Sequence, residues 1–213
     1  IDLHCDCEGV MHFYTEEPCW PQLEPLAHLL QSRAILLARN SGSGPFDECL
    51  SGAWWQLADR LKQDGIAAPL PQGCNSTTVE LRGESDVSHA WAKADAQAVF
   101  DFLCIAGAVH SATPVQVPAA LAQATPLAGS ETLHTPFPGV VAYIADVGQT
   151  LQKGDLVAEV INPIDNTSHP IYAGVAGVFY ARVRDRYVVS APLAGRLARL
   201  NLHEGDAVAA GQV

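Results

Sequence analysis

The sequence has little positive charge. It contains 12 lysines and arginines against 23 aspartates and glutamates, which gives a formal net charge of −11 at pH 7. Nucleic acids and anionic membrane surfaces are bound chiefly through lysine and arginine, so we expect neither as a partner. No apolar run approaches the roughly 18 residues of a transmembrane helix, so we expect no membrane span.

The sequence also lacks the C-x-x-C spacing that is typical of thiolate zinc sites. Its six cysteines all lie in the first half of the chain, at positions 5, 7, 19, 49, 74 and 104. We expect them to be reduced and structural, as in a cytoplasmic protein. For Cys5 and Cys7, a C-x-C thiolate site is the alternative to two small buried side chains.

Intrinsic disorder is excluded by composition, because 48% of the residues are hydrophobic and only 16% are charged. Residues 1–109 alternate strand-like and helix-like segments, which predicts an α/β domain. Residues 110–130 contain three prolines and are interpreted as a linker. Residues 131–213 carry many short strand-like segments with Gly-Asp turns, which predicts a small all-β barrel or sandwich.

The α/β region predicts three strands and three helices. The apolar run at 34–38 is typical of a buried strand in a parallel sheet. Apolar side chains recur at helical spacing over 86–109, with Ser85 or Asp86 as the cap. The other expected elements are a buried strand that ends at 1–4, a strand at 77–81, and helices over 23–31 and 53–64.

A histidine lies near the end of the first expected strand, two residues after an aspartate. Asp2 and His4 should project from the same face, since side chains alternate along a strand. Histidine is the commonest metal ligand, and a carboxylate beside it can orient the imidazole. His4 is therefore either a metal ligand positioned by Asp2 or a partly buried, hydrogen-bonded histidine.

A carboxylate interrupts the apolar strand at 77–81. Burying Glu80 is costly unless it is paired or functional. It is either a catalytic group or half of a structural ion pair with Arg82. Arg82 in turn is either a ligand for a substrate carboxylate, which a guanidinium can bind with two hydrogen bonds, or the partner of a nearby acid.

Other polar residues near these motifs have both a functional and a structural interpretation. Asp6 and Glu8 either line a site beside His4 or are ordinary loop carboxylates. We expect His12 to be structural or solvated. The glycine-rich segment 40–48 is either a lid or a plain surface loop.

The motifs D-L-H and T-V-E-L-R-G together resemble the succinylglutamate desuccinylase/aspartoacylase family. Glu80 follows His4 by 76 residues, and residues 1–15, residues 41–48 and the Gly-Asp turns of the β region add to the resemblance. It covers most of the chain and matches the C-terminal portion of the family. The resemblance implies an α/β, zinc carboxypeptidase-like mixed sheet with flanking helices. It also implies a C-terminal all-β barrel-sandwich domain of the biotinyl/lipoyl type.

The resemblance implies a zinc-dependent deacylase that cleaves the amide bond of an N-acyl amino acid or a related N-acyl amine. His4 matches the family's third zinc ligand, with Asp2 as its orienting partner. Glu80 matches the catalytic glutamate, which transfers the proton of a zinc-activated water to the departing amine. Arg82 would contact the substrate.

The family's first two zinc ligands come from an H-x-x-E motif, and the sequence contains no such pair. A catalytic zinc site uses three protein ligands, so these residues alone should be inactive. The chain begins at Ile1 without a methionine and stops at Val213 within a strand-like pattern. We therefore expect the missing ligands on a segment before Ile1.

A second hypothesis is a non-catalytic binding or adaptor module that works through the β domain. Covalent biotin or lipoate is not expected, because the hairpin at 161–170 has no lysine. In the enzyme hypothesis the β domain caps the site or forms a contact in a homo-oligomer. The repeat at 189–213 is an addition to the usual end of the family. An H-x-x-E motif upstream would support the enzyme, whereas a coiled-coil heptad or a signal peptide would support the adaptor.

Overall fold

The computed structural model describes residues 1–42, 44–135, 138–184, 188–189 and 196–202. The helices are α1 (Trp20–Leu29), α2 (Phe46–Gln63) and α3 (His89–Ile105), with short 3₁₀ turns η1 (Glu17–Cys19) and η2 (Leu127–Gly129). The first six strands are β1 (Asp2–Asp6), β2 (Glu8–Gly9), β3 (Met11–Glu16), β4 (Ala34–Ala38), β5 (Thr77–Gly83) and β6 (Ala124–Pro126). The later strands are β7 (Glu131–His134), β8 (Gly139–Tyr143), β9 (Thr150–Leu151), β10 (Leu156–Asn162), β11 (Thr167–Tyr172), β12 (Gly177–Arg182), β13 (Val188–Val189) and β14 (Arg196–Leu202).

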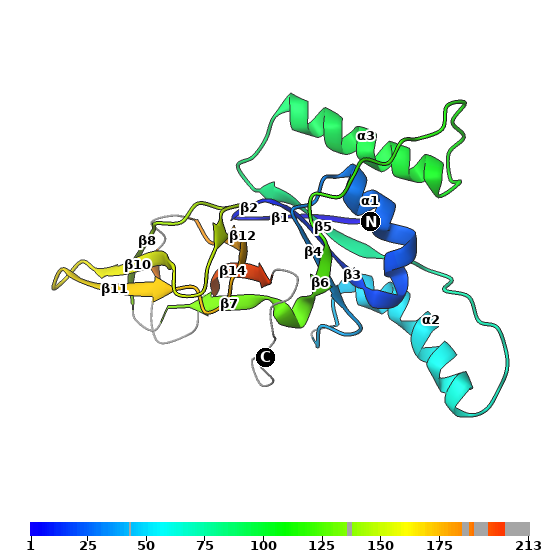
Figure 1. The fold of residues 1–213 in the computed structure, drawn as a ribbon, viewed down its shortest axis with the longest axis horizontal. Helices are drawn as coiled ribbons and strands as arrows, with labels where there is room; N and C mark the ends of the chain where they lie inside the picture. The colour runs from blue at the N-terminus through cyan, green and yellow to red at the C-terminus, as the bar shows by residue number, and fades with distance from the viewer. Residues whose placement is uncertain (43, 136–137, 185–187, 190–195, 203–213) are drawn as a thin grey trace.

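Five strands form a mixed sheet in the order β1-β5-β3-β4-β6. β5 runs parallel to β1 and antiparallel to β3, while β4 runs parallel to both β3 and β6. Figure 1 shows α3 and α2 on opposite sides of this sheet. The predicted mixed α/β fold is confirmed. No helix among the described residues has the length and apolar character needed to span a membrane.

One face of the sheet is apolar and packs against α1 and α3. Phe13 of β3 and Val79 of β5 are fully buried there, beside Leu26 of α1 and Phe102 of α3. Each such side chain contributes about 1.5–3 kcal/mol relative to an exposed one. Because strand side chains alternate, Glu80 projects from the opposite face, which is therefore available for polar chemistry.

The first strand is present, but the expectation that it is buried is wrong. Within the described chain β1 lies at the edge of the sheet and pairs only with β5, which leaves Leu3 54% exposed. Cys5, on the same edge strand, and Cys7, which follows this strand, are both exposed, against the expectation of small buried side chains. All six cysteines are free thiols.

All three helices begin at different residues from those expected, and α1 starts at Trp20 rather than at 23. α2 starts at Phe46 rather than at 53, because Pro45 provides an extended N-cap and two acidic residues in the first turn favour the positive end of the helix dipole. α3 starts at His89, and its cap is Ser88, whose hydroxyl accepts the backbone N–H of Trp91 over 3.1 Å. Asp86 instead accepts the N–H of Gly83 over 2.9 Å in the preceding turn.

The second region forms two antiparallel sheets, β11-β10-β8-β13 and β2-β12-β14-β7, with β9 also paired to β12. β12 pairs with β2, so a strand from the C-terminal region is hydrogen-bonded beside the segment that follows His4. β6 lies within 110–130, the expected linker, and extends the first sheet. The domain division and the barrel-sandwich architecture of 131–213 stay predictions, and most of the repeat at 189–213 lies outside the described residues.

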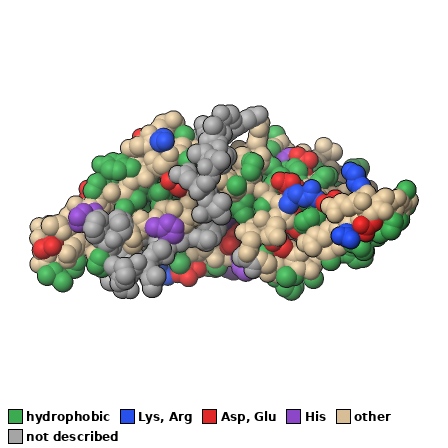
Figure 2. Space-filling view, turned by 90° about the horizontal axis from the view of Figure 1, so that it is seen from below, with side chains coloured by type: hydrophobic (Ala, Val, Ile, Leu, Met, Phe, Trp, Pro, Cys, Tyr) green, Lys and Arg blue, Asp and Glu red, His purple; other side chains and the backbone are tan. Residues whose placement is uncertain are grey.

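Lysine and arginine side chains are scattered over the face of the molecule in Figure 2 rather than gathered in one patch. Acidic side chains are interspersed with them.

Candidate functional site

Three adjacent strands place polar side chains on the face of the first sheet opposite α1 and α3. β5 lies between β1 and β3, and Glu80 is the register partner of His4 on one side and of His12 on the other. Residues paired across neighbouring strands project from the same face. The polar side chains that this register brings to one face are Asp2, His4, His12, Tyr14, Thr78 and Glu80.

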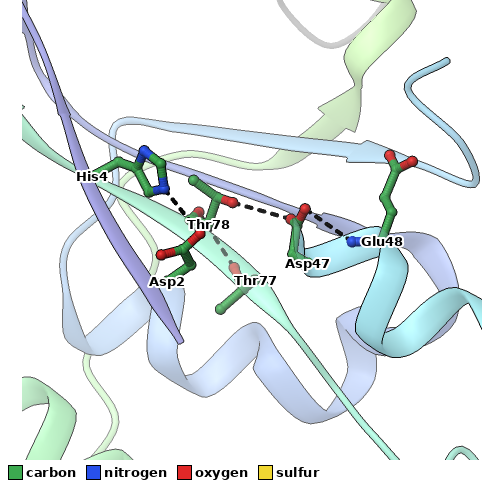
Figure 3. Close-up of polar contacts among 6 residues, drawn as sticks. All are labelled: Asp2, His4, Asp47, Glu48, Thr77 and Thr78. Atoms are coloured by element: carbon green, nitrogen blue, oxygen red, sulfur yellow. Dashed lines mark hydrogen bonds and ion pairs between the residues drawn. The ribbon is translucent and has the colours of Figure 1, made fainter. Parts of the chain in front are cut away.

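Asp2 and His4 interact directly on this face (Figure 3). Nε2 of His4 donates a hydrogen bond to Oδ2 of Asp2 over 2.9 Å. This hydrogen bond raises the pKa of His4 above its usual 6.5, and the carboxylates of Glu80 and Asp47 raise it further, while burial opposes the shift. The predicted placement on one side of the strand is thus observed, and Nδ1 is the ring nitrogen that remains for a metal ion.

Hydrogen bonds connect the face to the start of α2 (Figure 3). The hydroxyl of Thr78 donates to Oδ2 of Asp47 over 3.2 Å, and Oδ1 of Asp47 accepts the N–H of Glu48 over 3.0 Å. Burial is the largest cause of the raised pKa of Asp47. Glu48 accepts the hydroxyl of Tyr14 and, over 2.7 Å, the backbone N–H of Ser41. One end of the segment 40–48 is therefore attached to the sheet through α2.

A second polar cluster lies deeper on the same face. His12 is only 1% exposed, and its Nδ1 lies 2.9 Å from the carbonyl oxygen of Val10. Its Nε2 lies 3.3 Å from Oδ2 of Asp6. One ligand atom each from Asp6, His12 and Glu80 all lie within 4.8 Å of one another. The ring of Tyr180, from β12, packs edge-on against His12 with ring centroids 4.9 Å apart.

The sequence interpretation left His12 outside the site. The available signal was local alternation, since His12 precedes Phe13 and the two must face opposite sides of the strand. Alternation separates His12 from the apolar core but does not identify its neighbours. Its proximity to Glu80 depends on the pairing of β3 with β5.

Arg82 reaches the opposite side of the sheet from Glu80. Its guanidinium forms an ion pair with Asp95 and lies 4.8 Å from the centroid of the Trp91 ring, and both partners belong to α3. Residues two apart on a regular strand share a face, but the backbone φ of +70° at Arg82 interrupts this alternation. The ion pair with a nearby acid is therefore present, and the substrate-binding role of Arg82 stays a prediction.

Glu8 has a partner in the C-terminal region. Its Oε2 accepts the Nε–H of Arg182 over 2.6 Å, and the same guanidinium lies 4.4 Å from the centroid of the Tyr143 ring. Arg182 also donates to the carbonyl oxygen of Ala145 over 2.9 Å. These contacts attach β12 to the turn after β1.

No protein-family model matches the chain, and no curated protein sequence matches it significantly. Solved structures of the succinylglutamate desuccinylase/aspartoacylase family share its fold. A family structure from Shewanella frigidimarina NCIMB 400 has a TM-score of 0.74 at 20% identity and covers 94% of this chain and 52% of that chain. One from Shewanella amazonensis SB2B has a TM-score of 0.73 at 19% identity, with 94% and 53% covered.

A third similar structure is the product-bound ectoine utilization protein EutE (DoeB) from Ruegeria pomeroyi. Its TM-score is 0.65 at 14% identity, and the match covers 95% of this chain and 57% of that protein. These likenesses establish the fold and agree with the mixed α/β architecture that the resemblance implied. The chain spans little more than half the length of these similar structures.

Proposed function

We propose that this chain forms part of a zinc-dependent hydrolase that cleaves the amide bond of an N-acyl amino acid or a related N-acyl amine. The observation that carries the proposal is the register of His4 with Glu80 on the adjacent strands β1 and β5. It brings an imidazole and a carboxylate to one face of the sheet. A metal ligand and a proton-transferring carboxylate are two of the groups that metal-assisted hydrolysis requires.

The donor chemistry at His4 fits a zinc ion. Imidazole nitrogen is a preferred zinc ligand, and ligating histidines usually donate their other N–H to a carboxylate or a carbonyl. Asp2 holds Nε2 in this way over 2.9 Å, which leaves Nδ1 for the metal. When bound, zinc would lower the pKa of a coordinated water and polarise the amide carbonyl. His4 would supply one of the three protein ligands that a catalytic zinc site uses.

Glu80 is the general base and then the general acid of the proposed reaction. Its carboxylate accepts a proton from the attacking water and delivers it to the leaving amine nitrogen, which releases a carboxylic acid and an amine. The half-buried position of Glu80 on β5, between two paired strands, supports this role because a strand holds the carboxylate more rigidly than a loop would.

The test compares the full-length protein with its Glu80→Gln variant on a panel of N-acyl amino acids, by release of free amine. Turnover should fall by about 10²–10⁴-fold, the usual contribution of general acid–base catalysis. Zinc is measured as metal per chain, with and without the additional His4→Ala change. The zinc that is lost when His4→Ala is added is the zinc bound through His4, and the Glu80→Gln variant should still bind it. The exposed Glu24→Gln change on α1 is the matched control and should retain turnover.

Retained turnover in Glu80→Gln would contradict the mechanism. If the wild-type protein binds no zinc through His4 and hydrolyses no member of the panel, the alternative of a binding or adaptor module would replace the hydrolase.

A further inference from the structure

The cluster of Asp6, His12 and Glu80 has the composition of a metal site that does not involve His4. Among the residues that the structure describes, it is the one group of three or more potential ligands with all ligand atoms within 4.8 Å of one another. Asp6 Oδ2, His12 Nε2 and Glu80 Oε2 are all buried atoms. They come from three adjacent strands of the same sheet.

The hydrogen bonding of His12 fixes which of its nitrogens can bind a cation. Nδ1 lies 2.9 Å from the carbonyl oxygen of Val10, which can only accept, so Nδ1 carries the ring proton. In the neutral imidazole, Nε2 then directs a lone pair toward Asp6 Oδ2, 3.3 Å away. Histidines that ligate metals commonly donate their other N–H to a backbone carbonyl, as His12 does.

Contacts from β12 hold this arrangement in place. The fully buried Tyr180 packs against the His12 ring, and its carbonyl oxygen accepts the N–H of Val10 over 2.9 Å. The carbonyl of Val10 that orients His12 is thereby positioned by a strand from the C-terminal region. The approach is close at Gly9, where a Cβ would lie 3.3 Å from the Tyr180 carbonyl oxygen and 3.4 Å from the Asp6 Cβ. Ligands supported in this way are preorganised.

We propose that Asp6, His12 and Glu80 bind a divalent first-row transition metal ion at a position separate from the His4 metal. One imidazole and two carboxylates form a mixed nitrogen and oxygen ligand set, which suits zinc and manganese. Calcium and magnesium prefer oxygen ligands alone, so the imidazole selects against them. The two carboxylates balance the charge of the ion. The inference does not depend on the hydrolase: it needs Glu80 only as an oxygen donor, and a Glu80 that holds this ion is not at the same time the free base of the proposed reaction.

The test uses the full-length protein after removal of metals with a chelator, titrated by calorimetry with Zn²⁺ alone and, separately, with Mn²⁺ alone. The His4→Ala variant should still bind metal. Adding His12→Gln to His4→Ala should abolish this binding. Because His12 is buried and its replacement can impair folding, Asp6→Asn serves as a second variant with nearly the same shape. Losing a ligand should weaken binding by more than the roughly 10–100-fold that outer partners of metal sites contribute.

The matched control is His28→Gln on α1, where the histidine lies 3.8 Å from Glu24 and away from the cluster. Its metal affinity should equal that of the parent. Circular dichroism of each variant separates loss of binding from loss of fold.

Two results would overturn the proposal. One is equal metal affinity in the parent, Asp6→Asn and His12→Gln proteins. The other is that His4→Ala binds neither Zn²⁺ nor Mn²⁺, which would leave His12 as an imidazolium paired with Asp6. Neither result depends on turnover, so a failure of the hydrolase proposal is distinguishable from a failure of this one.

Discussion

Asp2 and His4 share one side of β1, and a 2.9 Å hydrogen bond joins Oδ2 of the aspartate to Nε2 of the histidine. The side chain of His4 is 51% exposed, so packing does little to fix its ring. The carboxylate of Asp2 therefore supplies the orientation, and it favours the protonated imidazole. This hydrogen bond is the largest cause of the raised pKa of His4.

The Asp2→Asn change should lower the pKa of His4 toward the ordinary histidine value. Asparagine has nearly the same shape but no charge, so it removes both the charge-assisted hydrogen bond and the attraction to the imidazolium. The measurement is a pH titration of the His4 ring proton resonances by NMR, with a chelator present to keep metal ions away.

The matched control for this titration is Asp59→Asn, which removes an exposed carboxylate paired with Arg39 over 2.7 Å. The His4 titration in this control should follow the wild-type protein. An unchanged pKa in Asp2→Asn would mean that the carboxylates of Asp47 and Glu80 dominate the shift.

Local periodicity predicted the parts of the fold and site that depend only on neighbouring residues. The strand at 34–38 was predicted to the residue because an apolar run is bounded there by polar residues and a turn. The shared side of Asp2 and His4 follows from alternation along an extended strand. Both features are specified within a few residues.

The contact between His12 and Glu80 was not predictable in this way. Their strands are far apart in sequence, and their antiparallel register is set by the packing of Phe13 and Val79 against the helices. A shift of one residue would reverse the face of every side chain, and nothing in the local pattern fixes the register. The face of Arg82 was not predictable for the opposite reason. The local pattern indicates regular alternation along the strand, but the positive φ at Arg82 breaks it and turns the side chain to the other face.

The start of α2 was missed because its first turns are held by distant partners. Within FDECLSG, Ser51 donates to the carboxylate of Glu16 at the end of β3, and Asp47 accepts from Thr78 on β5. Serine and glycine have low helix propensity, so the local pattern gives a weak signal. Tertiary hydrogen bonds stabilise this turn instead.

Glu16 should make the stability of the protein depend on pH. It is buried, and it accepts hydrogen bonds from the indole N–H of Trp55 over 2.7 Å and from the hydroxyl of Ser51. Burial raises its pKa above the usual 4.5, and the two hydrogen bonds oppose part of that shift. A carboxyl group whose pKa is higher in the folded state binds its proton more tightly there. Its stabilising contribution is complete below the unfolded-state pKa and is lost as the pH rises through the folded-state pKa.

The stability of the wild-type protein relative to Glu16→Gln should therefore increase as the pH falls from 7 toward 4.5. Urea unfolding of both proteins at a series of pH values measures the difference. Trp55→Phe is the companion variant. It removes a donor that favours the charged form, so it should raise the pKa of Glu16 further and steepen the dependence. A constant difference between wild type and Glu16→Gln across this range would contradict the prediction.

Arg82 and Asp95 should stabilise the fold as a coupled pair. Their side chains are 15% and 20% exposed, so removing either one leaves the other charge largely shielded from water without its partner. Arg82→Gln and Asp95→Asn should each lower the free energy of unfolding by about 1–3 kcal/mol. The double variant should lose less than the sum, with a coupling of about 0.5–3 kcal/mol.

Urea unfolding of the four proteins of this cycle gives the coupling directly. The exposed ion pair between Arg60 and Asp64 on α2, at 2.9 Å, is the matched control, and its cycle should give about 0.3–0.5 kcal/mol because solvent screens it. Additive losses for Arg82 and Asp95 would mean that their contact contributes no coupling energy to the fold.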